Sequence, residues 1–150
     1  MEPRGIRNCN PGNIRITKDK WQGLREVQED KEFFQFKAMK WGYRAMIRTL
    51  QNYRKRHECW TIGDFIRRWA PPSENNTVSY IRYVCEKMGV PPAYVPNVDD
   101  KATMCLIAYA ISYYEKAIEN SYNDEALRKK RNKAFEILEE YLFPKKVNKR

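Results

Sequence analysis

Apolar side chains recur at three- and four-residue spacing in five stretches of the sequence, and this pattern constrains the fold more than any other feature. Residues three and four positions apart lie on one face of an α-helix, so each stretch predicts an amphipathic helix. The fourth stretch has the widest apolar face and is expected to form the central, most buried helix. The predicted helices cover residues 43–56, 61–69, 77–88, about 101–120 and about 124–142.

Polar residues at the predicted helix ends support these boundaries. Thr61 and Asp64 have the spacing of a capping box, in which each side chain accepts a hydrogen bond from the other residue's backbone N–H. Pro71 and Pro72 end the second helix, because proline has no N–H to donate. The other expected caps are Asn76 or Thr77 before the third helix, Gly89 after it, and the pair Asp99 and Asp100 before the fourth.

Two short apolar runs near the N-terminus follow a different pattern. Residues 24–27 and 33–36 flank a charged bend at residues 29–31, which predicts a small β-hairpin. The expected fold class is therefore mainly α, of the α+β kind, with one hairpin. A chain of 150 residues buries roughly two-thirds of its unfolded surface. We expect a single domain over residues 1–143 and a flexible basic tail over residues 144–150.

The charge balance and the cysteine spacing restrict the function. Lys and Arg number 29 against 19 Asp and Glu, and the net charge of +10 predicts attraction to polyanions such as nucleic acid or an anionic cell envelope. No stretch approaches the ~20 apolar residues of a membrane span, and no apolar run follows the first residues. We therefore expect synthesis in the cytoplasm without a signal peptide. His57 is the only histidine and no Cys-x-x-Cys spacing occurs, so no metal and no cofactor are expected. Free, mostly buried thiols are expected at Cys9, Cys59, Cys85 and Cys105.

Residues 4–15 hold three asparagines, two glycines and three arginines, so this segment is suited to presenting polar groups. Within it, residues 10–13 read Asn-Pro-Gly-Asn, which predicts a type II turn with glycine at positive φ. Carboxamides both donate and accept hydrogen bonds, as sugar hydroxyls and N-acetyl groups require, and a tryptophan offers a flat face to a pyranose ring. The alternative is a capped loop whose asparagines bond only their own backbone. The side chains concerned are Asn8, Asn10, Asn13 and Trp21.

Glu115 follows an apolar and aromatic run, residues 110–114, in the fourth predicted helix. Desolvation and the negative end of the helix dipole would both raise the pKa of its carboxyl. A carboxyl that stays protonated near neutral pH suits a general acid that protonates a leaving oxygen. The alternative is a solvated glutamate paired with Lys116 or with a basic residue of the fifth helix.

Five motifs follow one another along the chain, at residues 4–15, 21–23, 33–36, 42–45 and 68–80. Together they resemble a family of phage and prophage virion or endolysin proteins with a lysozyme-like fold. They are also similar to a rearranged bacterial cell-wall glucosaminidase domain, in which residues 110–115 would be the counterpart of the helix that carries the catalytic glutamate. The resemblance implies a lysozyme-like helical domain that cleaves peptidoglycan.

The resemblance makes Glu115 the expected general acid, with Glu119 as the second choice. Glycoside cleavage also needs a second carboxylate, or a substrate N-acetyl group in its place. Asp30 on the predicted hairpin is the selected candidate. The other acidic candidates are Glu26, Glu29, Glu32 and Glu74. The expected substrate contacts are Asn8, Asn10, Asn13, Arg15, Trp21, Glu74, Asn76 and Tyr80, with Trp69 as an additional candidate.

The leading hypothesis is a monomeric enzyme that cleaves peptidoglycan glycan strands as a muramidase, glucosaminidase or lytic transglycosylase. It would act at the cell wall after release from the cell or as part of a virion, with virion components as further partners. A second hypothesis is an inactive virion structural or wall-binding protein. A third is a nucleic-acid-binding helical protein, based on basic runs at residues 54–56, 67–68 and 128–131. The third is less favoured, because no helix-turn-helix or zinc-finger signature accompanies the runs.

Overall fold

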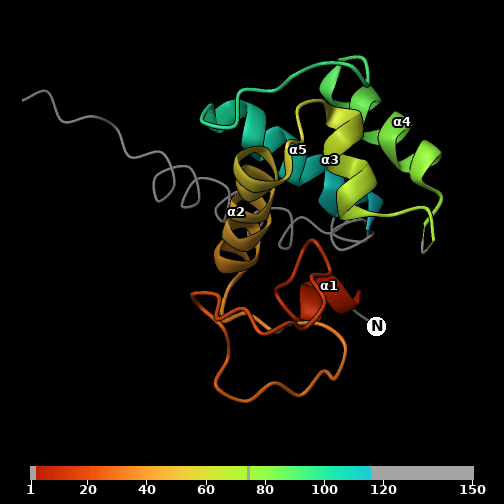
Figure 1. Cartoon of the computed structure of the whole chain (residues 1–150). Coiled ribbons are helices and arrows are strands. Elements are labelled where there is room, and N and C mark those ends of the chain that lie inside the picture. Colours follow the sequence, from red (N-terminus) through yellow and green to blue (C-terminus); the bar gives the residue numbers. More distant parts are fainter. Residues whose placement is uncertain (1–2, 74, 116–150) are drawn as a thin grey trace, which may run out of the picture.

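The computed structural model describes residues 3–73 and 75–115, which form a mainly α-helical fold. This part of the chain contains α1 (Arg4–Arg7), α2 (Met39–His57), α3 (Ile62–Trp69), α4 (Thr77–Met88) and α5 (Lys101–Tyr114). Residues 3–38, which precede α2 and contain α1, are called the N-terminal segment. In Figure 1 this segment lies at one end of α2, and α3, α4 and α5 pack together at the other. The predicted mainly α class is confirmed. The predicted helix at 124–142, the part of the 101–120 helix beyond Glu115 and the tail at 144–150 lie outside the described residues.

The helix ends form where the capping residues predict them. Thr61 Oγ1 accepts a hydrogen bond from the Asp64 backbone N–H at 3.0 Å, and Asp64 Oδ2 accepts one from the Thr61 N–H at 3.0 Å, so the capping box is present. Asn76 caps α4, and Asp100 caps α5. Gly89 ends α4 at a φ of 69°, in the left-handed region that glycine enters without a steric penalty. By contrast, α2 starts four residues before the expected Tyr43.

The apolar faces of α2 to α5 bury one core. Helix α4 packs against α3 and α5, and α5 also packs against α2. Helix α5 contributes Met104, Ile107 and Ile111 with no exposed surface, as its wide apolar face predicts. A smaller cluster joins Phe34 and Phe36 of the N-terminal segment to Ala45 of α2.

The predicted β-hairpin is wrong, because the part of the chain that the structure describes contains no strand. Among the described residues, the pairing is limited to two isolated antiparallel bridges, Arg15 to Phe33 and Leu24 to Phe36. The Arg25 N–H donates to the Gln35 carbonyl at 3.0 Å, but the Gln35 N–H donates to Gln28 Oε1 at 2.7 Å, so a side chain and not a strand satisfies it. Side-chain hydrogen bonds of this kind satisfy the backbone without extending a ladder.

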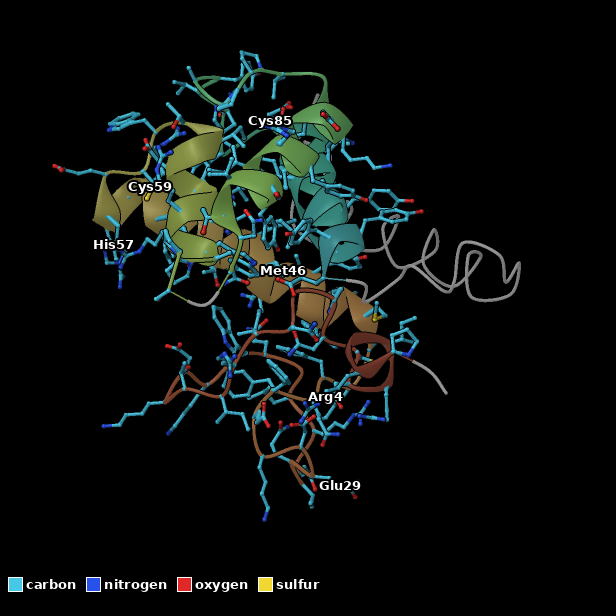
Figure 2. All side chains as sticks on the ribbon, turned by 90° about the vertical axis from the view of Figure 1, so that its right-hand side faces the viewer. Arg4, Glu29, Met46, His57, Cys59 and Cys85 are labelled. Carbon is cyan, nitrogen blue, oxygen red and sulfur yellow. The ribbon has the colours of Figure 1, made fainter. Side chains whose placement is uncertain are left out.

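The turn at residues 10–13 also differs from the prediction. The Asn13 N–H donates to the Asn10 carbonyl at 3.0 Å, but the residue with positive φ is Asn13, at 47°, and not Gly12. The type II assignment is therefore wrong. Gly12 is needed for space, because a Cβ there would lie 2.8 Å from Met46 Cγ and 2.9 Å from Trp69 Cζ2. Figure 2 shows Met46 of α2 where the helices meet the N-terminal segment, which carries Arg4 and Glu29.

Helix α2 approaches the N-terminal segment most closely at Gly42. A Cβ on Gly42 would overlap the Cys9 carbonyl oxygen and would lie 2.5 Å from Pro11 Cδ. Both neighbours belong to rigid groups, a peptide unit and a proline ring, which have little freedom to move aside. Gly42 thus sets the distance between α2 and residues 9–11.

Asp30 connects α1 to the loop around residues 30–33. Its carboxylate accepts two hydrogen bonds from the Arg4 guanidinium, at 2.6 and 2.8 Å, and one from Asn8 Nδ2 at 3.0 Å. The backbone N–H groups of Glu32 and Phe33 also donate to it. The bonds from Arg4 chiefly, with those from the backbone and Asn8, hold the pKa of Asp30 well below its usual range.

Candidate functional site

A cavity of about 360 Å³ lies between the N-terminal segment and the helices. One wall comes from residues 12–21 with Phe33, and the opposite wall comes from α2, from the end of α3 and from the C-terminal end of α5. The lining residues are Gly12, Asn13, Ile14, Arg15, Thr17, Asp19, Trp21, Phe33, Thr49, Tyr53, Trp69, Ala70, Asn75 and Glu115.

Glu115 is the C-cap residue of α5 and lines this cavity. Its Oε1 accepts a hydrogen bond from the Tyr80 hydroxyl at 2.8 Å, and its backbone carbonyl accepts one from Asn13 Nδ2 at 3.5 Å. Burial raises the pKa of the Glu115 carboxyl above its ordinary value of 4.5, because desolvation disfavours the charged form. Hydrogen bonds from Tyr80 and Asn13 and the positive charge of Arg15 oppose this rise without cancelling it.

Tyr80 lies behind Glu115 in the core. It has no exposed surface, and its ring stacks on Tyr114 with centroids 3.8 Å apart. Burial and the neighbouring Glu115 carboxyl raise the pKa of Tyr80 well above 10, so its hydroxyl remains a donor. The sequence prediction makes Tyr80 a saccharide contact, but the structure places it where it orients the Glu115 carboxyl.

Asn13 and Trp21 each bring an unused polar atom to the cavity wall. Among the described residues, neither Asn13 Oδ1 nor Trp21 Nε1 has a hydrogen-bond partner, although both atoms are buried. Unsatisfied buried polar atoms are uncommon, and each one has an energetic cost that a bound group could remove. One of these atoms is an acceptor and the other a donor. An acetamido group, with one N–H and one C=O, offers the two kinds of partner that these atoms lack.

Arg15 and Asp19 give the cavity charges of both signs. The Arg15 guanidinium lies 5.3 Å from the centroid of the Phe33 ring. Asp19 Oδ2 accepts a hydrogen bond from the Thr17 hydroxyl at 2.7 Å, and both residues are exposed. Among the described residues that line the cavity, Asp19 is the acidic residue other than Glu115. Sequence reasoning missed it, because nothing distinguishes one aspartate in an exposed polar run.

Other predicted contacts lie away from the cavity lining. Asn8 and Asn10 are completely buried; Asn10 bonds Ile14 and the Phe34 carbonyl, while Asn8 bonds Asp30 and Gln35. Asp30 is held by Arg4, with 6% of its side chain exposed. Asn76 caps α4. The structure therefore brings together four of the predicted residues, Asn13, Arg15, Trp21 and Glu115, with Trp69 as a fifth. Glu74 and Glu119 lie outside the described residues.

Thr49 and Tyr53 complete the wall on α2 and were not predicted. They lie four residues apart, on one face of the helix. Thr49 Oγ1 donates to the Ala45 carbonyl at 2.7 Å. The only sequence signal for Tyr53 was its apolar spacing, which also fits a core residue.

Removing the Tyr80 hydroxyl is expected to raise the pKa of Glu115 further. Tyr80→Phe takes away a hydrogen bond that stabilises the carboxylate, while the ring that stacks on Tyr114 stays in place. The measurement is a ¹³C NMR titration of the Glu115 side-chain carboxyl. Tyr114→Phe is the matched control and should leave the midpoint close to that of the wild type. A midpoint in Tyr80→Phe that is unchanged or lower would contradict the assigned role.

The described residues contain neither a metal-ligand cluster nor a disulfide. No group of three or more His, Cys, Asp or Glu in residues 3–73 and 75–115 is placed to hold a metal ion. The four cysteines, all within these ranges, are free thiols, and three of them are buried. No helix in the described part has the length and hydropathy that a bilayer crossing requires.

The fold and the cavity define a mainly helical protein with a desolvated acid in a polar and aromatic cavity. The chain is related to Protein P5 of Pseudoalteromonas phage PM2, with 41% identity over 91 residues. The match covers 59% of this chain and 57% of Protein P5, so it extends over little more than half of either protein. No protein-family model matches the sequence.

Proposed function

We propose that this protein cleaves the glycan strands of peptidoglycan, with Glu115 as the general acid. The observation that carries the proposal is a desolvated carboxyl, oriented by a buried tyrosine, in a cavity whose opposite wall holds unused hydrogen-bonding groups. A carboxyl with a raised pKa keeps its proton closer to neutral pH and delivers it to the glycosidic oxygen as the bond breaks.

The opposite wall supports an N-acetylated sugar as the substrate. Asn13 Oδ1 accepts the acetamido N–H and Trp21 Nε1 donates to the acetamido carbonyl, which satisfies both atoms at once. The Trp21 and Trp69 rings line the same cavity and offer apolar faces to pyranose rings. Both alternating sugars of peptidoglycan carry an acetamido group. The net charge of +10 concentrates the protein at an anionic envelope.

Asp19 replaces Asp30 in this proposal as the candidate for the second carboxylate. Asp30 makes strong bonds to Arg4, and it does not line the cavity. Asp19 lines the cavity and bonds Thr17. The alternative to a second carboxylate is the substrate acetamido group, which can assist bond cleavage in its place.

Purified sacculi provide the test. Wild-type protein is expected to release soluble muropeptides and to lower the turbidity of the suspension. Mass spectrometry of the products then identifies the new ends: reducing muramic acid for a muramidase, reducing glucosamine for a glucosaminidase, or an anhydro-sugar for a transglycosylase. Binding to sacculi without any soluble product would contradict the proposal and would favour the second candidate, a wall-binding or virion structural protein. That candidate is supported by the relation to a phage protein.

The nucleic-acid hypothesis receives little support from the basic residues. The Arg54 guanidinium donates to the carbonyls of Cys59, Trp60 and Pro96, and Arg67 pairs with Asp64 at 3.0 Å. These two charges are used within the protein, which leaves a less continuous basic surface than residues 54–56 and 67–68 suggest.

A further inference from the structure

A second depression adjoins the cavity that contains Glu115. It has a volume of about 600 Å³, and its lining includes Arg67, Arg68 and Pro71. Tyr53 lines both the cavity and this depression, and Pro71 follows directly after the cavity residues Trp69 and Ala70. The two depressions therefore share the Tyr53 side chain as a wall.

Of the two arginines in the depression, Arg68 has the charge available for a ligand. Arg67 already pairs with Asp64 at 3.0 Å. Arg68 is exposed, and among the described residues its guanidinium forms no ion pair. Its Cζ lies 5.3 Å from the centroid of the Tyr53 ring, so the guanidinium contacts the side chain that lines both depressions.

A carboxylate is the group that this guanidinium fits. Arginine presents a planar fork of N–H donors that bonds both oxygens of a carboxylate, and such charge-assisted bonds are among the stronger ones. In peptidoglycan, each lactyl ether on muramic acid bears a peptide with free carboxylates. These carboxylates project sideways from the strand, at a distance from the bond that is cut. Unsubstituted N-acetylglucosamine polymers have none.

We propose that Arg68 binds a carboxylate of the peptide stem, so that the protein prefers glycan whose stems carry free carboxylates over glycan whose stem carboxylates are amidated. This inference rests on the proposed function, since it places a glycan strand in the cavity. It assigns Arg68 to substrate selection and not to the chemical step.

The test compares two substrates that differ only in the charge of the peptide stem. Glycan strands are used before and after chemical amidation of the stem carboxylates, and kcat/KM is measured on both. Wild-type protein should prefer the strands with free carboxylates. Arg68→Gln should reduce that preference about tenfold, the loss of one charge-assisted hydrogen bond, and should leave cleavage of the amidated strands unchanged. Arg56→Gln, which removes an exposed positive charge outside the depression, is the matched control and should keep the wild-type preference.

Two outcomes would overturn the inference. One is an Arg68→Gln variant that keeps the wild-type preference. The other is a variant that loses activity equally on both substrates, because that pattern indicates a structural or non-specific charge effect.

A binding experiment separates this inference from the proposed function. Calorimetry with a purified disaccharide-peptide, and with the same compound after amidation of its carboxylates, reports binding without any cleavage. If wild-type protein cleaves nothing but binds the acidic compound in an Arg68-dependent manner, the proposed enzyme is wrong and the carboxylate site stands. If cleavage occurs and the two compounds bind equally, the carboxylate site is wrong and the enzyme stands.

Discussion

The Glu115→Gln variant is expected to cleave sacculi at least about a hundredfold more slowly than the wild type, since general acid catalysis typically contributes 10²–10⁴-fold. Glutamine has nearly the shape of glutamate, and its Oε1 still accepts the Tyr80 hydrogen bond. It lacks the proton that the leaving oxygen needs. The measurement is the initial rate of muropeptide release at matched protein concentrations, followed over the pH range in which the wild type is active.

Unfolding cannot account for the expected loss of activity. Because burial raises the pKa of Glu115 in the folded protein, ionisation of this carboxyl opposes folding. The wild type should therefore lose stability as the pH rises from the ordinary pKa of glutamate through the raised folded-state pKa. Glu115→Gln lacks this titration. At neutral pH we expect it to unfold at the same urea concentration as the wild type or at a higher one.

A second carboxyl variant controls for general effects of charge. Glu86 is exposed on α4 and does not line the cavity. Glu86→Gln makes the same change in net charge as Glu115→Gln. It should cleave at the wild-type rate, because Glu86 does not line the cavity. A Glu115→Gln variant with wild-type activity would exclude Glu115 as the acid.

Gly42→Ala is expected to destabilise the protein by about 1–3 kcal/mol, the usual cost of forcing a methyl group into a packed contact. The new Cβ would overlap the Cys9 carbonyl oxygen and would lie 2.5 Å from Pro11 Cδ, so the N-terminal segment has to move away from α2. The same movement displaces Asn13 and Trp21 relative to Glu115. Cleavage should fall together with stability, as measured by urea unfolding and by muropeptide release.

Gly63→Ala is the matched control, since it makes the same change in another helix. A Cβ on Gly63 would lie 3.1 Å from the end of the Arg67 side chain, which is flexible and can move aside. Replacing glycine by alanine inside a helix is otherwise favourable by up to about 1 kcal/mol. Gly63→Ala should thus be as stable as the wild type or more stable. Equal stability of Gly42→Ala and the wild type would show that the contact between α2 and residues 9–11 is loose.

The helices could be predicted because their signals are local. The capping box of Thr61 and Asp64 involves residues three positions apart, and Gly89 ends α4 through its own φ. The failures concern residues whose roles depend on distant partners. Gly12 was assigned to a turn, but the structure needs it for space beside Met46 and Trp69. The hairpin was predicted from apolar spacing, but the Gln35 N–H bonds the Gln28 carboxamide instead of the backbone of the other run.

The candidate site was partly visible in the sequence for the same reason. Glu115 and Trp21 are conspicuous residue types in their local context, whereas Asp19 and Tyr53 resemble ordinary surface and core residues. Asn8 and Asp30 are as polar as Asn13, but their hydrogen bonds to the buried Gln35 and to the exposed Arg4 hold the N-terminal segment together. Polarity alone does not separate a binding group from a buried structural one.

A hydrogen bond between two residues that line the cavity joins Asn13 to Glu115, which are 102 positions apart in the chain. Contacts of such long span slow folding, because the loop must close before the contact can form. A nascent chain still emerging from the ribosome would have no acid opposite Asn13 until α5 has been translated and has docked. Under the proposed function, every shorter translation product would be inert toward glycan, so the order of synthesis itself would delay activity.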